Sequence, residues 1–249
     1  MMGKVGLQLY SIRELTQKDF FGTIEKVGKI GYDGVEFAGF FNAPAKELRK
    51  ALDNSGLEAC GSHTAIDLLT KNLEEVMDYN HEIGNSFIIC PGIPENMRDS
   101  SDAWKRTADL FNEIGLKCKE NGFQFGYHNH SVEFQLFNGE YGFDILAENT
   151  RADLVCLQID TYWVEYEGLK SVDFMKKYHD RLPLIHIKQM KSFEDKRCTE
   201  IGKGVIDFKE IINLGKEYGT KWYIVEQEYF EIPYMQSIEE SLQYLKSIL

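Results

Sequence analysis

Strand-like and helix-like segments alternate along the whole of this chain, with roughly 30 residues in each pair. The strand-like runs are residues 5–11, 32–37, 57–63, 86–90, 123–134, 153–160, 184–188 and 222–226. Glycine closes several of the helix-like stretches between them, as at Gly31 and Gly219. Eight such units in 249 residues predict an α/β fold with a parallel sheet, a (β/α)8 TIM barrel that spans residues 1–249 as a single domain. The main alternative is an open doubly wound sheet, but the first strand lacks the GxGxxG turn of its nucleotide-binding versions.

Composition narrows the classes of partner. The formal net charge of -12 argues against binding to a nucleic-acid backbone, which needs a basic surface, and against a basic membrane patch. No apolar run approaches the ~20 residues that a membrane span requires. Five widely spaced cysteines without a CxxC pair predict free thiols in a reducing compartment, so we expect a cytoplasmic protein.

Polar side chains that bind metals or move protons recur where the strand-like runs end. They are Gln8, Glu36, His63, His128, Asn129, His130, Glu133, Gln158, Asp160, His186, Lys188, Glu226 and Glu228. The carboxyl ends of the strands form the active-site face of a parallel barrel. Residues two apart in a strand share a face, so each strand-end pair, such as His186 with Lys188, can look into the barrel mouth together.

Each of these residues also has a structural interpretation. A lone strand histidine is more often a hydrogen-bonded core residue than a ligand. A strand-end aspartate such as Asp160 often caps the following helix, although Tyr162 and Trp163 are poor residues to open one. The coincidence of so many at strand ends favours a functional site over these separate explanations.

Histidine and carboxylate ligands without cysteine suit one divalent ion, such as Mn²⁺, Zn²⁺, Co²⁺ or Mg²⁺. Such an ion polarises a sugar carbonyl and acidifies the neighbouring C–H bond, so that a nearby carboxylate or imidazole can move the proton. Lys188 can bind a substrate oxyanion or pair with a carboxylate of the barrel mouth. The Gly202-Lys203-Gly204 turn lies where barrels often bind phosphate, but it can equally be a tight turn before a helix.

With these residues in place, the chain resembles the xylose-isomerase-like barrel superfamily, and within it the sugar phosphate isomerase/epimerase group. That group includes inosose dehydratase, ketose 3-epimerases and hydroxypyruvate isomerase. The resemblance covers essentially the whole chain. The stretches that carry it are GLQLYSIR, GYDGVEFAG, GSHT, YHNHSVEF, QIDTYWVEYEG, LIHIKQMK, IGKGVIDF and YIVEQE.

The resemblance implies one metal ion held by a carboxylate of strand five together with Asp160, His186 and Glu226. Strand five departs from the pattern, because YHNH stands where epimerases carry a glutamate. Glu133 is then the expected ligand, with His128 or His130 as the alternative. The catalytic candidates are His130, His128, Glu226 and Glu133. The expected substrate contacts are Gln8, Glu36, His63, Trp163 and Lys188.

A second departure separates the chain from one branch of the superfamily. Members with several metal ions, such as apurinic endonucleases, have a histidine three residues after the strand-six aspartate, where Trp163 stands here. Together with the acidic charge, this argues against a DNA-repair nuclease. Trp163 and Tyr162 offer flat faces on which a sugar ring can stack.

The expected function is a divalent-metal-dependent isomerase or epimerase that acts on a sugar, keto-sugar or sugar phosphate. Proton abstraction next to a metal-polarised carbonyl would start the reaction. A dehydratase or lyase acting on a keto-sugar or cyclitol begins in the same way, and a non-catalytic sugar-binding barrel is the remaining alternative. The expected partner is a small carbohydrate. Aromatic residues in the loops at the barrel top could line the cleft or form a homodimer contact.

Overall fold

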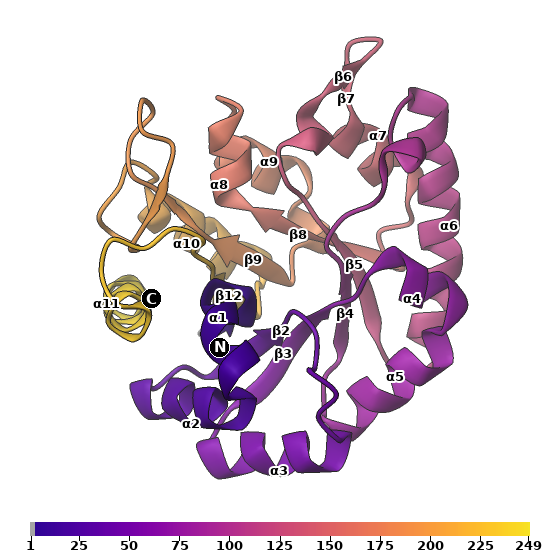
Figure 1. Ribbon diagram of the computed structural model, residues 1–249. Coiled ribbons are helices and arrows are strands. Elements are labelled where there is room, and N and C mark those ends of the chain that lie inside the picture. Colours follow the sequence, from indigo (N-terminus) through magenta and orange to yellow (C-terminus); the bar gives the residue numbers. More distant parts are fainter. Residues whose placement is uncertain (1–2) are drawn as a thin grey trace.

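The computed structural model describes residues 3–249 and confirms the closed barrel of eight parallel strands (Figure 1). Residues 1 and 2, the start of the expected domain, lie outside the described part. The barrel strands in sequence order are β1 (Lys4–Gln8), β2 (Gly34–Phe37), β3 (Glu58–His63), β4 (Phe87–Cys90), β5 (Gln124–His128), β8 (Val155–Asp160), β9 (Leu184–Ile187) and β12 (Trp222–Val225). Pairing of β1 with β12 closes the barrel.

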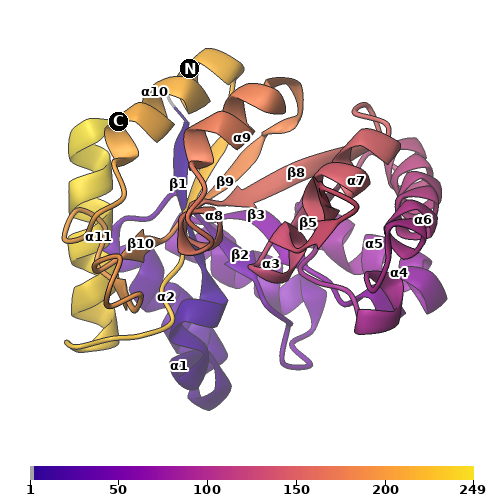
Figure 2. The ribbon, with the colours of Figure 1, turned by 90° about the horizontal axis from the view of Figure 1, so that it is seen from above.

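Helices surround the strands, with α11 and α6 on opposite sides of the barrel (Figures 1 and 2). The α-helices are α1 (Arg13–Lys18), α2 (Phe20–Ile30), α3 (Ala45–Ser55), α4 (Ile66–Lys71), α5 (Leu73–Glu82), α6 (Ser101–Glu120), α7 (Gly142–Asn149), α8 (Thr161–Tyr166), α9 (Ser171–Lys177), α10 (Phe208–Tyr218) and α11 (Tyr234–Ile248). Short 3-10 turns are η1 (Leu9–Ile12), η2 (Glu95–Met97), η3 (Val132–Phe134) and η4 (His179–Arg181). Within residues 3–249, no helix is both long and apolar enough to cross a membrane.

The lower part of the barrel interior is a closed apolar plug. Its members, which lie on alternate positions of the strands, are Cys60, Phe87, Ile89, Cys156, Leu184, Trp222 and Ile224. The outer faces of the same strands pack against the helices, which explains why runs such as FIIC in β4 are buried at every position. Because the plug fills the bottom, polar side chains inside the barrel gather at its upper, carboxyl end.

A bulge in β3 turns the side chain of His63 toward the barrel interior. The register between β2 and β3 shifts between Val35 and Glu36, so that Glu36 pairs with Gly61. Cys60 and His63 both face the interior as a result, although a regular strand would place residues three apart on opposite faces. A Cβ atom on Gly61 would lie 2.5 Å from Oε1 of Glu36, so the bulge also needs a residue without a side chain there.

The sequence-based expectations miss several short elements. A helix, α8, does begin directly after Asp160, whose carboxylate accepts a hydrogen bond from the backbone N–H of Tyr162 at 2.9 Å. Asp160 is thus the helix cap that Tyr162 and Trp163 were expected to disfavour, because an aspartate N-cap outweighs weak propensities. Two small hairpins were also not expected: β6 (Leu136–Phe137) with β7 (Glu140–Tyr141), and β10 (Gln189–Met190) with β11 (Cys198–Thr199).

The expectation of free thiols is confirmed, since all five cysteines are unpaired and buried. Burial raises the pKa of Cys90, Cys118 and Cys156 to about 12. We therefore predict that a disulfide reagent such as DTNB, at about pH 8, modifies none of these three in the native protein within minutes. All five should react once guanidinium chloride unfolds the chain, which provides the positive control. Rapid native modification of Cys90, Cys118 or Cys156 would contradict this account of the core.

Candidate metal centre at the barrel mouth

Four potential metal ligands converge at the carboxyl ends of adjacent strands. His128 at the end of β5, Asp160 at the end of β8, His186 in β9 and Glu226 after β12 each offer one donor atom, and these atoms lie within 4.8 Å of one another. All four side chains are buried. The order β5, β8, β9 and β12 is also the order of neighbours in the barrel wall, so the fold itself brings the four together.

His186 is held from both sides by carboxylates. Its Nε2 lies 2.6 Å from Oε2 of Glu36, and its Nδ1 lies 2.6 Å from Oε2 of Glu226. Burial alone would lower the pKa of His186, but the charge of Glu36 and the hydrogen bonds to both carboxylates raise it to about 10. The ring is therefore an imidazolium in this arrangement. A metal ion bound through His186 would replace one of its two protons.

Glu36 is the centre of a buried hydrogen-bond network. Its Oε2 accepts a hydrogen bond from Gln8 Nε2 at 2.8 Å, and its Oε1 accepts one from Gln158 Nε2 at 2.6 Å. Gln158 also contacts Nε2 of His63 through its Oε1 at 2.8 Å. Burial raises the pKa of Glu36, but the charges of His63 and His186 outweigh burial and hold it well below its usual range. The network fixes a permanent carboxylate beneath the four donors.

The unsatisfied atoms of the cluster fit a divalent cation. Oδ2 of Asp160 and Nδ1 of His128 are buried without a hydrogen-bond partner in the described residues. Burial raises the pKa of Asp160 to about 7, because Lys188 offsets only part of the desolvation. Burial and the neighbouring His186 hold the pKa of His128 well below its usual value, so its ring is the neutral form that binds metals. Buried donors of this kind are costly unless something binds them.

The other residues of the YHNH stretch shape the site without joining the four donors. Oδ1 of Asn129 accepts the backbone N–H of Asp160 at 3.0 Å, which ties the ends of β5 and β8 together. The carboxylate of Glu133 accepts hydrogen bonds from the Tyr127 hydroxyl at 2.5 Å and from the backbone N–H of His130 at 2.7 Å. Glu133, the expected strand-five ligand, is therefore occupied inside its own loop, and His128 takes its place among the four.

His130 stands at the entrance of the site. Its ring centroid lies 4.8 Å from that of His128 and 5.7 Å from that of Trp163. No hydrogen bond to either ring nitrogen occurs within residues 3–249. Burial lowers the pKa of His130 to about 4, so at neutral pH the imidazole is uncharged.

Lys188 is a fully buried cation at the rim of the donor cluster. Its Nζ pairs with the carboxylate of Glu228 and lies 3.4 Å from Oε1 of Glu226. The rings of Tyr162 and Trp163 cover it, with centroids at 5.0 and 4.8 Å. Burial would lower the pKa of Lys188, but Glu226 and the other carboxylates raise it well above its usual value. Lys188 is therefore a fixed positive charge rather than a base.

The structure brings most of the expected site residues together. Gln8, Glu36, His63, Trp163 and Lys188 line or support the same barrel mouth as the four donors. Their place at or just after strand ends indicated them from sequence, but it could not indicate the hydrogen bonds of Asn129 and Glu133, which depend on the loop after β5. Lys203 of the Gly-Lys-Gly turn points elsewhere, since its Nζ lies 2.5 Å from Oε2 of Glu240 on α11.

The sequence matches a known protein family and several known enzymes. Residues 24–248 match the family described as the xylose isomerase-like TIM barrel. An inosose dehydratase from Clostridium beijerinckii is 24% identical over 85% of this chain and 83% of its own length. An inosose dehydratase from Lacticaseibacillus casei is 26% identical over 84% of this chain and 82% of its own length.

Solved structures agree with these matches. A sugar phosphate isomerase/epimerase from Parabacteroides distasonis superposes with a TM-score of 0.84 and 26% identity, over 99% of this chain and 95% of the other. An L-ribulose 3-epimerase has the same fold at 14% identity, with a TM-score of 0.74 over 100% of this chain and 95% of the other.

The donor set leads to a prediction about metal content. We expect the wild type to bind about one equivalent of divalent metal. Asp160→Asn should lose this metal, because the substitution removes a charged ligand oxygen. Glu133→Gln should keep it, since Glu133 only closes its own loop. Metal analysis after dialysis against Mn²⁺ or Zn²⁺ measures both.

The two variants are matched, because each changes a buried carboxylate to an amide. Asparagine can still cap α8 at position 160, so loss of metal there would not reflect loss of the helix cap. Retention of metal by Asp160→Asn together with its loss from Glu133→Gln would reassign the ligand to Glu133.

Proposed function

This chain belongs to the xylose isomerase-like TIM barrel family, and we propose that it is a divalent-metal-dependent isomerase or epimerase of a sugar, keto-sugar or sugar phosphate. The observation that carries the proposal is the convergence of His128, Asp160, His186 and Glu226 within 4.8 Å, with unpartnered buried donors on two of them. Sugar-modifying activities among its relatives and structural neighbours support the same class of reaction.

The four donors would hold the cation. When bound, it supplies Lewis-acid polarisation of a substrate carbonyl, which lowers the pKa of the neighbouring C–H bond. Glu36 would keep His186 oriented through the hydrogen bond to its Nε2. When that bond opens, the Glu36 carboxylate would instead accept a hydrogen bond from a substrate hydroxyl.

His130 is the proposed proton acceptor. Its ring is neutral, lacks a hydrogen-bond partner and stands next to His128 at the entrance. Delivery of a proton to the same carbon from the other face, by an acid other than His130, gives epimerisation, and transfer of the proton by His130 to the neighbouring carbon gives isomerisation. Lys188, held positive by its carboxylate neighbours, would stabilise the negative charge that develops on the substrate oxygens. Trp163 would cover the apolar face of the sugar ring.

A dehydratase is the second candidate function. Inosose dehydratases are about as similar to this chain as the isomerase/epimerase structure is. The strand-five histidines also favour it, because an acid is needed to protonate a departing hydroxyl, and His130 could serve after it has taken the α proton. The first step is shared, so one experiment tests both candidates.

We predict that metal-loaded protein in D₂O exchanges the C–H hydrogen next to the carbonyl of at least one member of a panel of ketoses and keto-cyclitols. Proton NMR follows the loss of that signal and identifies the product. A new epimer or isomer supports the first candidate, and loss of water from the carbon skeleton supports the second. His130→Gln should slow the exchange by ~100-fold or more while metal content is kept.

His179→Gln is the matched control, because His179 is exposed on η4, away from the strand ends. It should exchange at the wild-type rate, and removal of metal with a chelator should abolish exchange in both. Absence of exchange with every carbonyl sugar, in protein that holds its metal, would leave the non-catalytic sugar-binding barrel as the answer.

A further inference from the structure

A cavity lies beside the barrel mouth, against the aromatic rings that cover Lys188. Its volume is about 370 Å³, within the range of small-molecule sites. It shares Tyr162, Trp163 and Glu228 with the surroundings of Lys188. A ligand group in this cavity would therefore lie against side chains that also surround Lys188.

Four of the side chains that line this cavity are aromatic. Three come from the single helix α8, where the centroids of Trp163 and Tyr166 are 5.4 Å apart and those of Tyr162 and Trp163 are 4.8 Å apart. Tyr229, from the loop after β12, forms another part of the lining. The indole Nε1 of Trp163 is buried without a hydrogen-bond partner in the described residues. Flat faces with a spare donor suit a ring that carries oxygen atoms.

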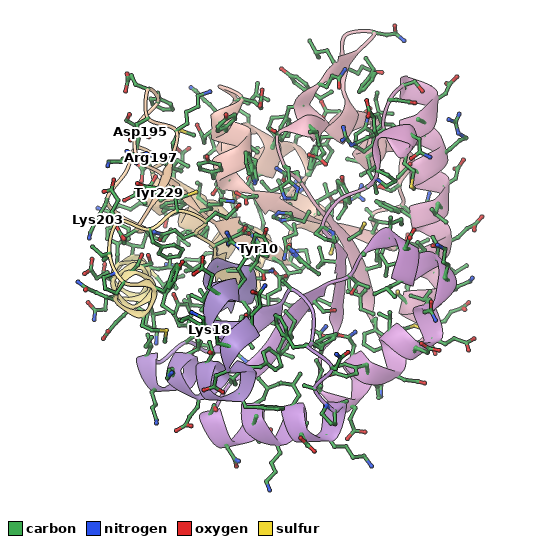
Figure 3. The ribbon with its side chains drawn as sticks, viewed as in Figure 1. Tyr10, Lys18, Asp195, Arg197, Lys203 and Tyr229 are labelled. Carbon is green, nitrogen blue, oxygen red and sulfur yellow. The ribbon has the colours of Figure 1, made fainter. Side chains whose placement is uncertain are left out.

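The cations that line the cavity already have partners. Arg197 donates from Nε and Nη2 to the carboxylate of Asp195 at 2.8 and 2.6 Å, and from Nη1 to the Tyr229 hydroxyl at 2.5 Å. Figure 3 shows these three residues next to one another. Lys196 donates to the backbone carbonyl of Tyr166 at 2.6 Å. An anionic ligand would have to break these pairs, whereas an uncharged one would leave them intact.

We propose that this cavity is a subsite for a second, uncharged ring attached to the sugar that reacts at the barrel mouth. The substrate class would then be a neutral glycoside whose reacting ring carries the carbonyl group, with a sugar or an aromatic ring as its second part, rather than a sugar phosphate. This inference rests on the proposed function for the position of the reacting sugar. The subsite itself is built from residues outside the metal donor set.

Calorimetric binding to metal-loaded protein tests the proposal with matched β-D-glucosides and β-D-galactosides. The methyl glycoside has one ring, the phenyl glycoside adds an aromatic ring, and the β-1,4-linked glucosyl disaccharide adds a sugar ring. We expect at least one two-ring compound to bind about 10-fold more tightly than its methyl counterpart. The phenyl and disaccharide arms distinguish the two kinds of ring. Equal affinity, or no binding in either series, would overturn the proposal.

Variants test whether any preference for a two-ring compound arises in this cavity. Tyr166→Ala and Tyr229→Ala should each remove most of the gain from the second ring and leave binding of the methyl glycoside unchanged. Tyr218→Ala, at the end of α10 and outside the cavity, is the matched control and should keep the gain. A gain that survives both cavity variants would place the second ring elsewhere and refute the subsite.

Glucose 6-phosphate tests the opposite possibility, that the cavity binds an anionic group. It should bind no more tightly than glucose, and Arg197→Gln should not weaken it. Tighter binding that Arg197→Gln abolishes would make the cavity an anion site and overturn the proposal. Repeating the glycoside series with Asp160→Asn separates the two proposals, because the ring preference should persist there, whereas exchange of substrate hydrogen should not.

Discussion

The clamp on His186 is the interaction on which the barrel mouth depends. A ring held by Glu36 from one side and Glu226 from the other links β2, β9 and β12 across the interior of the barrel. Its positive charge helps two buried carboxylates to remain ionised close to Asp160. Although both carboxylates are desolvated, the charge of His63 lowers the pKa of Glu36, and that of Lys188 lowers the pKa of Glu226, in the same sense. The clamp therefore helps to keep a ligand-rich centre inside a folded protein.

The barrel was predictable from sequence because its signals are periodic. Runs such as FIIC and LIHI alternate with helix-like stretches, and alternation within each strand also identifies His186, Lys188 and Asp160 as inward-facing. Other features follow from geometry that periodicity does not contain. The β3 bulge that turns His63 inward, the capping of α8 by Asp160 and the closed loop around Glu133 each depend on one local departure from regular structure.

Adjacent residues at the end of β5 and in the loop that follows it make different contacts. Tyr127 and Glu133 close the loop, His128 faces the donor cluster, Asn129 holds the backbone of Asp160, and His130 stands free at the entrance. The proposed ligand, His128, and the proposed proton acceptor, His130, are therefore separate side chains of one short stretch.

The apolar plug beneath the site has a consequence for how such a protein can change. Cys60, Ile89, Ile224 and their neighbours fill the closed end, while α8 and the loops after β9 and β12 line the cavity at the open end. Mutations in those upper segments leave the plug untouched. The surface of the open end can therefore change over evolutionary time while the interior that keeps the barrel closed stays the same.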